Sequence, residues 1–125
     1  MNTPLLAKAF KPGAAIAAYR IVKFDSAEYQ VVQASAATDK LVGISDALGA
    51  AATDTQVGIN MVGIAPVEYG GNVTRGDPLT SDGDGKAITA TAAGGSNVRL
   101  IGIAGSSGVL GDIGSAIISQ SLMQG

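Results

Sequence analysis

The chain has 125 residues, the usual length of one domain, and a net charge of −2. It has no Cys and no His, which excludes disulfides, thiolate nucleophiles, zinc–cysteine sites and the commonest general base. Its eight Lys and Arg residues form no basic cluster, so we expect no nucleic-acid partner. Because no apolar run approaches the length of a membrane span and residues 1–11 do not form a secretory signal, we expect a protein made in a cytoplasm with no membrane partner.

The first segment, residues 1–13, contains Pro4, Pro12 and Gly13 and shows no clear period. Proline disfavours helix at the residue before it and has no N–H for a central strand. We therefore predict an extended N-terminal arm over residues 1–13 that stands outside the β core. A single β domain over residues 14–125 follows it.

From Tyr19 onward the sequence is typical of short strands separated by Gly-rich turns. The predicted strands are residues 19–24, 29–33, 41–45, 56–62, 63–68 (interrupted at Pro66), 86–91, 98–104 and 113–119. Residues 46–53 are rich in Ala and could form one or two weak helical turns at most. This pattern predicts an all-β domain, a compact sandwich or barrel.

Three blocks of the chain recur in the same order, which suggests two similar halves over about residues 14–68 and 71–120. The pattern equates Ile16 with Val73, Gly43 with Gly102, and Gly58 with Gly114, at offsets of 57, 59 and 56. Chance similarity among strands rich in Gly, Ile and Val is the alternative.

The candidate chemistry is sparse, and we assign no catalytic residue, no cofactor site and no metal ligand. Residues 105–108 do not form the G-x-S-x-G turn of a serine nucleophile and are interpreted as a flexible loop. Residues 82–86, Asp-Gly-Asp-Gly-Lys, are interpreted as a tight turn, because Lys86 stands where a calcium loop needs an oxygen ligand. We therefore expect that the protein is not an enzyme and has no small-molecule substrate.

Two other readings remain open. Residues 76–79 with 84–87 are similar to the biotinyl and lipoyl carrier domains, which would place Lys86 on a hairpin tip, although Gly85 separates Asp84 from Lys86 here. A tail-spike or adhesin module is the second. It would need aromatic platforms for a sugar, and the chain has five aromatic residues, of which at least two should be in the core: Phe10, Tyr19, Phe24, Tyr29 and Tyr69.

The order of elements over about residues 5–120 resembles the capsid cement, or head decoration, proteins of tailed bacteriophages. The most specific part is G-N-V-x-R-G-D-P-L-x-x-D-x-x-G-K, from Gly71 to Lys86. It lies between the strands Leu41–Ser45 and Leu100–Ala104, and Gly111-Asp112 precedes the last strand. Each element alone is short, and their order carries the resemblance.

The resemblance implies a β-tulip domain that assembles as a homotrimer on the outer capsid surface and stabilises the junctions between capsomers. Its partner would be the major capsid protein, over which the N-terminal arm would reach. Low charge and many small residues suit a chain that buries surface in such an assembly. The expected contact residues of the arm are Pro4, Leu5, Leu6, Lys8, Phe10, Lys11 and Pro12. Packing of the arm on its own domain or on a trimer neighbour is the alternative.

Overall fold

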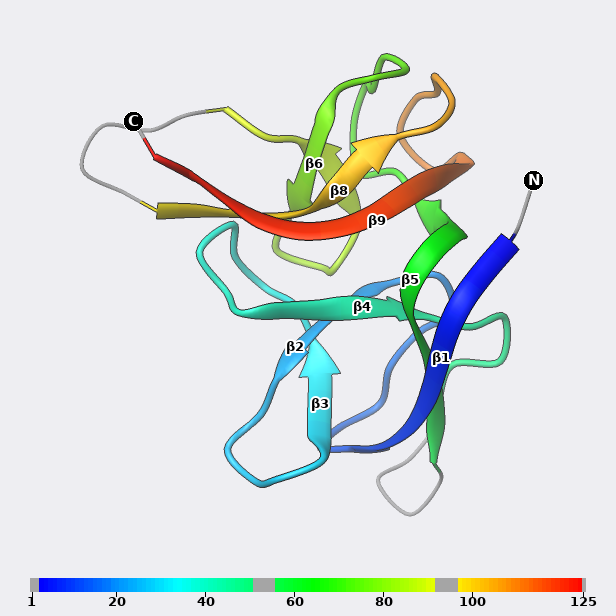
Figure 1. The fold of residues 1–125 in the computed structure, drawn as a ribbon, viewed down its shortest axis with the longest axis vertical. Helices are drawn as coiled ribbons and strands as arrows, with labels where there is room; N and C mark the ends of the chain where they lie inside the picture. The colour runs from blue at the N-terminus through cyan, green and yellow to red at the C-terminus, as the bar shows by residue number, and fades with distance from the viewer. Residues whose placement is uncertain (1–2, 51–55, 92–96, 125) are drawn as a thin grey trace.

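The computed structural model describes residues 3–50, 56–91 and 97–124, and these residues form an all-β fold, as expected (Figure 1). No helix occurs among them, and so none that could cross a membrane. Of the weakly helical segment, residues 46–50 form a turn, whereas 51–53 lie outside the described residues. The strands are β1 (Thr3–Pro12), β2 (Ile21–Phe24), β3 (Gln30–Gln33), β4 (Leu41–Ser45), β5 (Val57–Glu68), β6 (Pro78–Ser81), β7 (Ala87–Thr89), β8 (Asn97–Ala104) and β9 (Ile113–Gln124).

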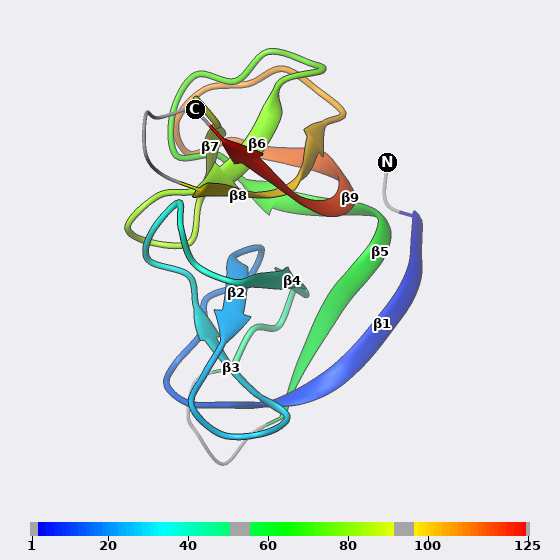
Figure 2. The same cartoon turned by 60° about the vertical axis from the view of Figure 1, so that its left-hand side comes forward.

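Five strands close into a small barrel in the order β1-β3-β2-β4-β5, because β1 also pairs with β5. The β1–β3 pairing is parallel and the others are antiparallel, so the barrel is mixed. The four remaining strands continue from β5 in the order β9-β8-β6-β7 and pack outside this barrel. Figures 1 and 2 show the two groups of strands stacked along the long axis, with β5 running from one group into the other.

The N-terminal segment is extended, but the expectation that it stands outside the β core is wrong for residues 3–12. These residues form β1, which pairs with β5 along most of its length and with β3 at Lys11 and Pro12. Phe10 is only 6% exposed and belongs to the core of the barrel. Pro4 is tolerated because it lies where β1 has β5 on one side and no strand pairing on the other.

Strand β5 replaces two predicted strands. Residues 57–68 form one strand of 12 residues, and Pro66 does not interrupt it but pairs with Ser115 of β9. On its other side β5 is covered by β1 only as far as Ile64, so no ladder there needs the N–H that Pro66 lacks. Leu41–Ser45 is confirmed as a strand with those bounds, whereas β6 was not predicted.

The strand registers of the two groups correspond. In the first group Val22 pairs with Gly43, and in the second group the equivalent residue Leu79 pairs with Gly102. Ile16 and Val73, which are also equivalent, both lie in isolated antiparallel bridges. The β1–β5 and β5–β9 ladders match at a constant offset of 57: Phe10–Val57 with Val67–Gly114, Ala9–Gly58 with Pro66–Ser115, and Lys8–Ile59 with Ala65–Ala116. By this register Gly58 corresponds to Ser115, one residue away from the expected Gly114.

Two clusters of buried side chains make up the core. One fills the five-strand barrel and includes Phe10, Val22 and Ile59. The other lies within the second group of strands and extends to the outer face of the barrel, where Ile21 and Ile44 point toward the second group. The second group therefore packs on the outside of β2 and β4.

Candidate functional site

The expected arm residues have divergent environments. Leu6 is 51% exposed, and Lys8 and Lys11 are also exposed, whereas Phe10 and Pro12 are buried in the molecule. The side chains of Pro4 and Leu5 lie outside the described residues. Direct contact with another chain is therefore open to Leu6, Lys8 and Lys11.

An apolar groove lies beside β1. Leu6 pairs with Val62 of β5, and both side chains are exposed. The groove is lined by Leu6, Phe24, Leu41, Val42, Met61, Val62 and Gln120. The sequence did not single out Met61, Val62 or Gln120, and it indicated Phe24 only as an aromatic residue that could stack on a sugar.

The side chain of Gln120 forms one wall of this groove. Its amide nitrogen donates hydrogen bonds to the carbonyl oxygens of Val42, at 2.6 Å, and Met61, at 2.9 Å. Gln120 thereby fixes β9 against β4 and β5 at the point where the two groups of strands meet.

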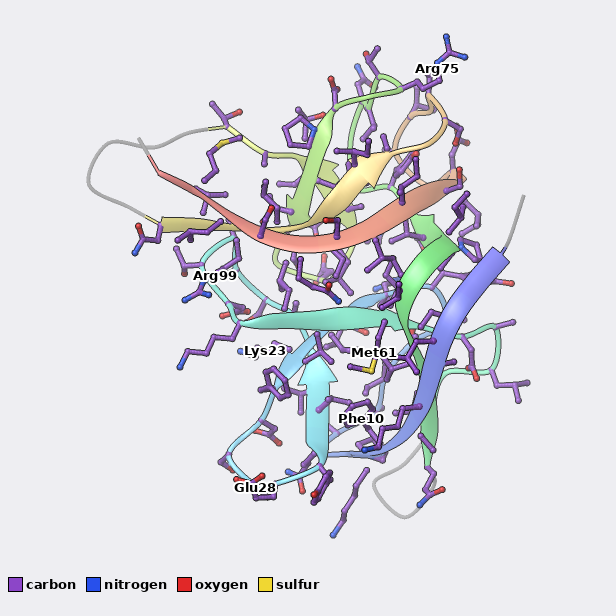
Figure 3. All side chains as sticks on the ribbon, in the orientation of Figure 1. Phe10, Lys23, Glu28, Met61, Arg75 and Arg99 are labelled. Atoms are coloured by element: carbon purple, nitrogen blue, oxygen red, sulfur yellow. The ribbon has the colours of Figure 1, made fainter. Side chains whose placement is uncertain are left out.

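A second hollow opens at the lower end of the barrel, beside the turn between β2 and β3. Figure 3 shows Phe10 and Met61 on this side, with Glu28 at the turn. The Nζ atom of Lys8 lies 5.9 Å from the ring centre of Phe10 and 5.2 Å from that of Tyr29. These distances are within the range of cation–π attraction, so Lys8 covers the aromatic side of the hollow.

A charged cluster joins the two groups of strands at their contact. Glu68 accepts from Arg20 Nη2 at 3.2 Å and lies 3.3 Å from Lys86 Nζ. Arg20 also donates to the carbonyl oxygen of Asp84 at 2.9 Å. Lys86 is therefore half-buried and paired, unlike the free tip lysine that the carrier-domain reading requires.

The Asp82–Lys86 segment is the tight turn that the sequence indicated. Asp82 Oδ1 accepts from the backbone N–H groups of Asp84 and Lys86, and Gly85 has a φ of 75°. Among the described residues no cluster of three or more His, Cys, Asp or Glu side chains could hold a metal ion.

Ser106 also has a structural role. Its carbonyl oxygen accepts from the Tyr69 hydroxyl at 2.6 Å, and its Oγ accepts from Ser115 N at 3.2 Å. Through these two hydrogen bonds Ser106 ties the 105–112 loop to Tyr69 and Ser115 and so stabilises it.

Two carboxyl groups on the barrel have lowered pKa values. The pKa of Asp25 is lowered mainly by a hydrogen bond from the side chain of Gln30. For Asp39, burial raises the pKa, but hydrogen bonds from Ser35 N and Ala36 N and the charge of Lys23 outweigh it and lower the pKa overall. Both groups order loops: Asp25 accepts from the side chain of Gln30, and Asp39 accepts from Ser35 N and Ala36 N beside Lys23.

The sequence of residues 5–109 matches the family model described as "Phage cement protein". Since this match covers most of the chain, the protein belongs to the phage cement protein family, whose members are structural components of the phage head and not enzymes. No curated protein matches the chain.

Among solved structures, the chain is similar to the N base of the head fiber protein gp8.5 of bacteriophage phi29. The sequences are 21% identical, the match covers 91% of this chain and 93% of that chain, and the TM-score is 0.68. At this identity the likeness shows a shared fold.

Proposed function

We propose that this protein is made in the host cytoplasm, binds the outer face of a phage head as a homotrimer and stabilises the junctions between capsomers. Membership of the cement family carries this proposal. The family explains why the candidate chemistry is so sparse, since a protein that ties capsid subunits together needs adhesive surface and no acid, base or metal. Many copies of a modest contact give a large total stabilisation of a shell.

The capsid-binding surface is the exposed part of β1 from Leu6 to Lys8 with its neighbour on β5. It comprises residues 6–8 and Val62, and the Leu6–Val62 pair is its apolar centre. Exposed apolar patches of this kind mark protein contacts, and Lys8 adds a cation suited to an acidic capsid surface. Phe10 and Pro12, which were expected to touch the capsid, instead anchor this strand from within, and Lys11 lies at its far end.

The finer fold assignment, a β-tulip domain built from two similar halves, is also a proposal. The corresponding registers support the duplication, because the β1–β5 and β5–β9 ladders agree at an offset of 57 and the β2–β4 and β6–β8 pairs agree at offsets of 57 and 59. Strand β5 then serves both halves: its first part completes the barrel, and its second part takes the place of β1 in the second group.

An adhesin-type module is the second candidate, and the exposed rings of Phe24 and Tyr29 favour it. Aromatic rings at a surface can stack on sugars. Binding of a glycan that is lost in Tyr29→Ala would support this function, and a protein without glycan binding that still decorates heads would exclude it.

The capsid contact can be tested with Leu6→Asp mixed with undecorated heads of the phage. A charge at the apolar centre should weaken binding at least about tenfold, or about 1.4 kcal/mol per site. Leu48→Asp is the matched control, because Leu48 is an exposed leucine in the turn after β4, outside the proposed surface. Unchanged binding of Leu6→Asp in a head co-sedimentation assay would contradict the assignment of this surface.

A further inference from the structure

The contact between the two groups of strands is asymmetric: the second group packs on the outer face of the first. On that face Ile21 and Ile44 are fully buried. Ile21 N donates to the carbonyl oxygen of Gly85 at 2.7 Å, on the turn between β6 and β7. Arg20 forms its ion pair with Glu68 at the border of the same contact.

The corresponding face of the second group is uncovered. The registers equate Ile21 with Pro78 and Ile44 with Ile103, because Ile21 pairs with Ile44 as Pro78 pairs with Ile103. Ile44 is 0% exposed, whereas Ile103 is 43% exposed, and its cross-strand partner Ile117 is also exposed. The apolar surface that the first group buries is thus presented to solvent by the second.

Within the chain, the part of the second group that docks on the Ile21–Ile44 face is the turn between β6 and β7, which contacts Ile21 through Gly85. The first group has an equivalent turn, residues 25–29. This turn is uncovered and borders the hollow beside Phe10. Two aromatic side chains stand open there, Phe24 with 56% and Tyr29 with 70% of its surface exposed.

Charged residues of opposite sign stand beside the two uncovered surfaces: Lys11 is exposed, and Asp77 is half-buried, with its Oδ2 accepting from Thr74 N and Thr89 Oγ1. At the offset of 57, Glu68 corresponds to Lys11 and Arg20 corresponds to Asp77. The Arg20–Glu68 ion pair within the chain thus has a counterpart with both signs reversed, Asp77 on one surface and Lys11 on the other. An ion pair between copies at these positions would have the acid and the base exchanged.

We propose that copies of this chain associate head to tail, repeating between copies the contact that joins the two groups within one copy. The Pro78–Ile103 surface of one copy covers the Phe24–Tyr29 hollow of the next, and Asp77 faces Lys11. Figure 3 shows Glu28, beside the hollow, at one end of the long axis and Arg75, two residues before Asp77, at the other, so one chain cannot make this contact with itself. Head-to-tail contacts close into a ring of three when each copy is rotated by one third of a turn from the last, so this inference rests on the proposed homotrimer and supplies its interface.

Lys8 is the side chain that such a contact must displace. It lies over Phe10 and Tyr29, and its counterpart in the second group is Ala65, which is fully buried. A flexible lysine over these two rings shields them from water in the free copy, and its long stem lets the ammonium group move to the rim when a neighbour docks.

Charge reversal tests the pairing of Lys11 with Asp77 by sedimentation of the free protein over a concentration series. Lys11→Glu and Asp77→Lys alone each place like charges together and should weaken self-association about tenfold. The double variant restores opposite charges and should recover most of the loss. Ile103→Asp should weaken association more strongly than either, whereas Leu48→Asp should not change it. A double variant as weak as the sum of its parts would overturn the pairing.

Cysteine cross-linking tests the direction of the contact, because the chain has no cysteine of its own. A double variant, Lys11→Cys with Asp77→Cys, should form disulfide-linked oligomers under mild oxidation, and equimolar mixing of the two single variants should give linked dimers. Each single variant alone should remain unlinked, because in a head-to-tail contact residue 11 of one copy faces residue 77 of the next and never residue 11. Linked dimers of a single variant, or no linking of the double variant in solution or on heads, would contradict the head-to-tail contact. If heads are still decorated in that case, the proposed function stands and this interface falls.

Discussion

At the scale of single residues, Tyr69 shows how the second group of strands accommodates its core. The ring is fully buried, and its hydroxyl donates to Ser106 O. A Cβ atom at Gly108 or Gly114 would meet this ring, so both positions require glycine. In the barrel the position of Gly114 is taken by Val57, and the smaller Pro12 stands where Tyr69 does. The two cores therefore fill equivalent space with different residues.

Asp39 organises the loop between β3 and β4. Its Oδ2 atom accepts from Ser35 N at 2.8 Å and Ala36 N at 2.9 Å, and it lies 3.4 Å from Lys23 Nζ. The same loop presents the carbonyl oxygen of Ala37, which accepts from Arg99 N at 2.7 Å. An acid on the barrel thus orders a loop that holds the second group of strands.

We expect Asp39→Asn to lower the free energy of unfolding by about 1 kcal/mol at neutral pH, because the charge-assisted bonds are lost. The pKa of Asp39 is lowered in the folded state, so its ionised form contributes stability above the ordinary pKa of 3.8 and loses it as the pH falls below that value. The difference between wild type and variant should therefore vanish in strong acid. Urea unfolding at several pH values measures it.

The matched control is Glu28→Gln, which removes an exposed carboxylate from the turn between β2 and β3. It should change the free energy of unfolding by less than about 0.5 kcal/mol. A deficit of Asp39→Asn that is equally large in strong acid would mean that shape, and not charge, accounts for the effect.

At the scale of elements, β1 is where sequence reasoning failed. Two prolines and no clear apolar period suggested an arm outside the β core. In the structure β1 closes the barrel through its pairing with β5. Its first proline lies where one edge is unpaired, and its second ends the strand, so neither conflicts with a sheet.

We therefore expect Phe10→Ala to lower the free energy of unfolding by about 3–5 kcal/mol, since it empties part of the barrel core. Leu6→Ala, on the same strand but exposed, should cost less than about 1 kcal/mol. Denaturant unfolding of the two variants tests this contrast directly. Equal, small losses would place β1 outside the core after all. Deletion of residues 2–11 should abolish cooperative folding and is unsuited to testing capsid contacts.

Most other elements could be read from alternation and turns. The β2–β3 hairpin, β4, β8 and β9 appear in the sequence as apolar strands between turn signals, and the structure differs mainly at their ends. Strand β6 was missed because residues 78–81 begin with proline and contain one large apolar side chain, Leu79. The groove was missed for a different reason: Leu6, Phe24 and Gln120 come from distant parts of the chain, and the barrel alone brings them together.

At the scale of the whole molecule, polar bonds orient the two groups of strands as much as apolar packing does. The Arg20–Glu68–Lys86 cluster is partly buried, and Gln120 spans β4 and β5. Strand β5 runs through both groups, so neither can turn freely about the other. This connection suits the proposed function, in which the protein holds subunits of a shell at fixed spacing.

Cryo-electron microscopy of undecorated phage heads mixed with the purified protein tests the proposed function most directly. We predict threefold density on the outer capsid face at the junctions between capsomers, with residues 6–8 of β1 against the major capsid protein. Leu6→Asp should reduce the occupancy of these positions, and Leu48→Asp should not. Heads that remain bare at saturating protein, or density confined to the tail, would contradict the assignment of this protein as a head decoration protein.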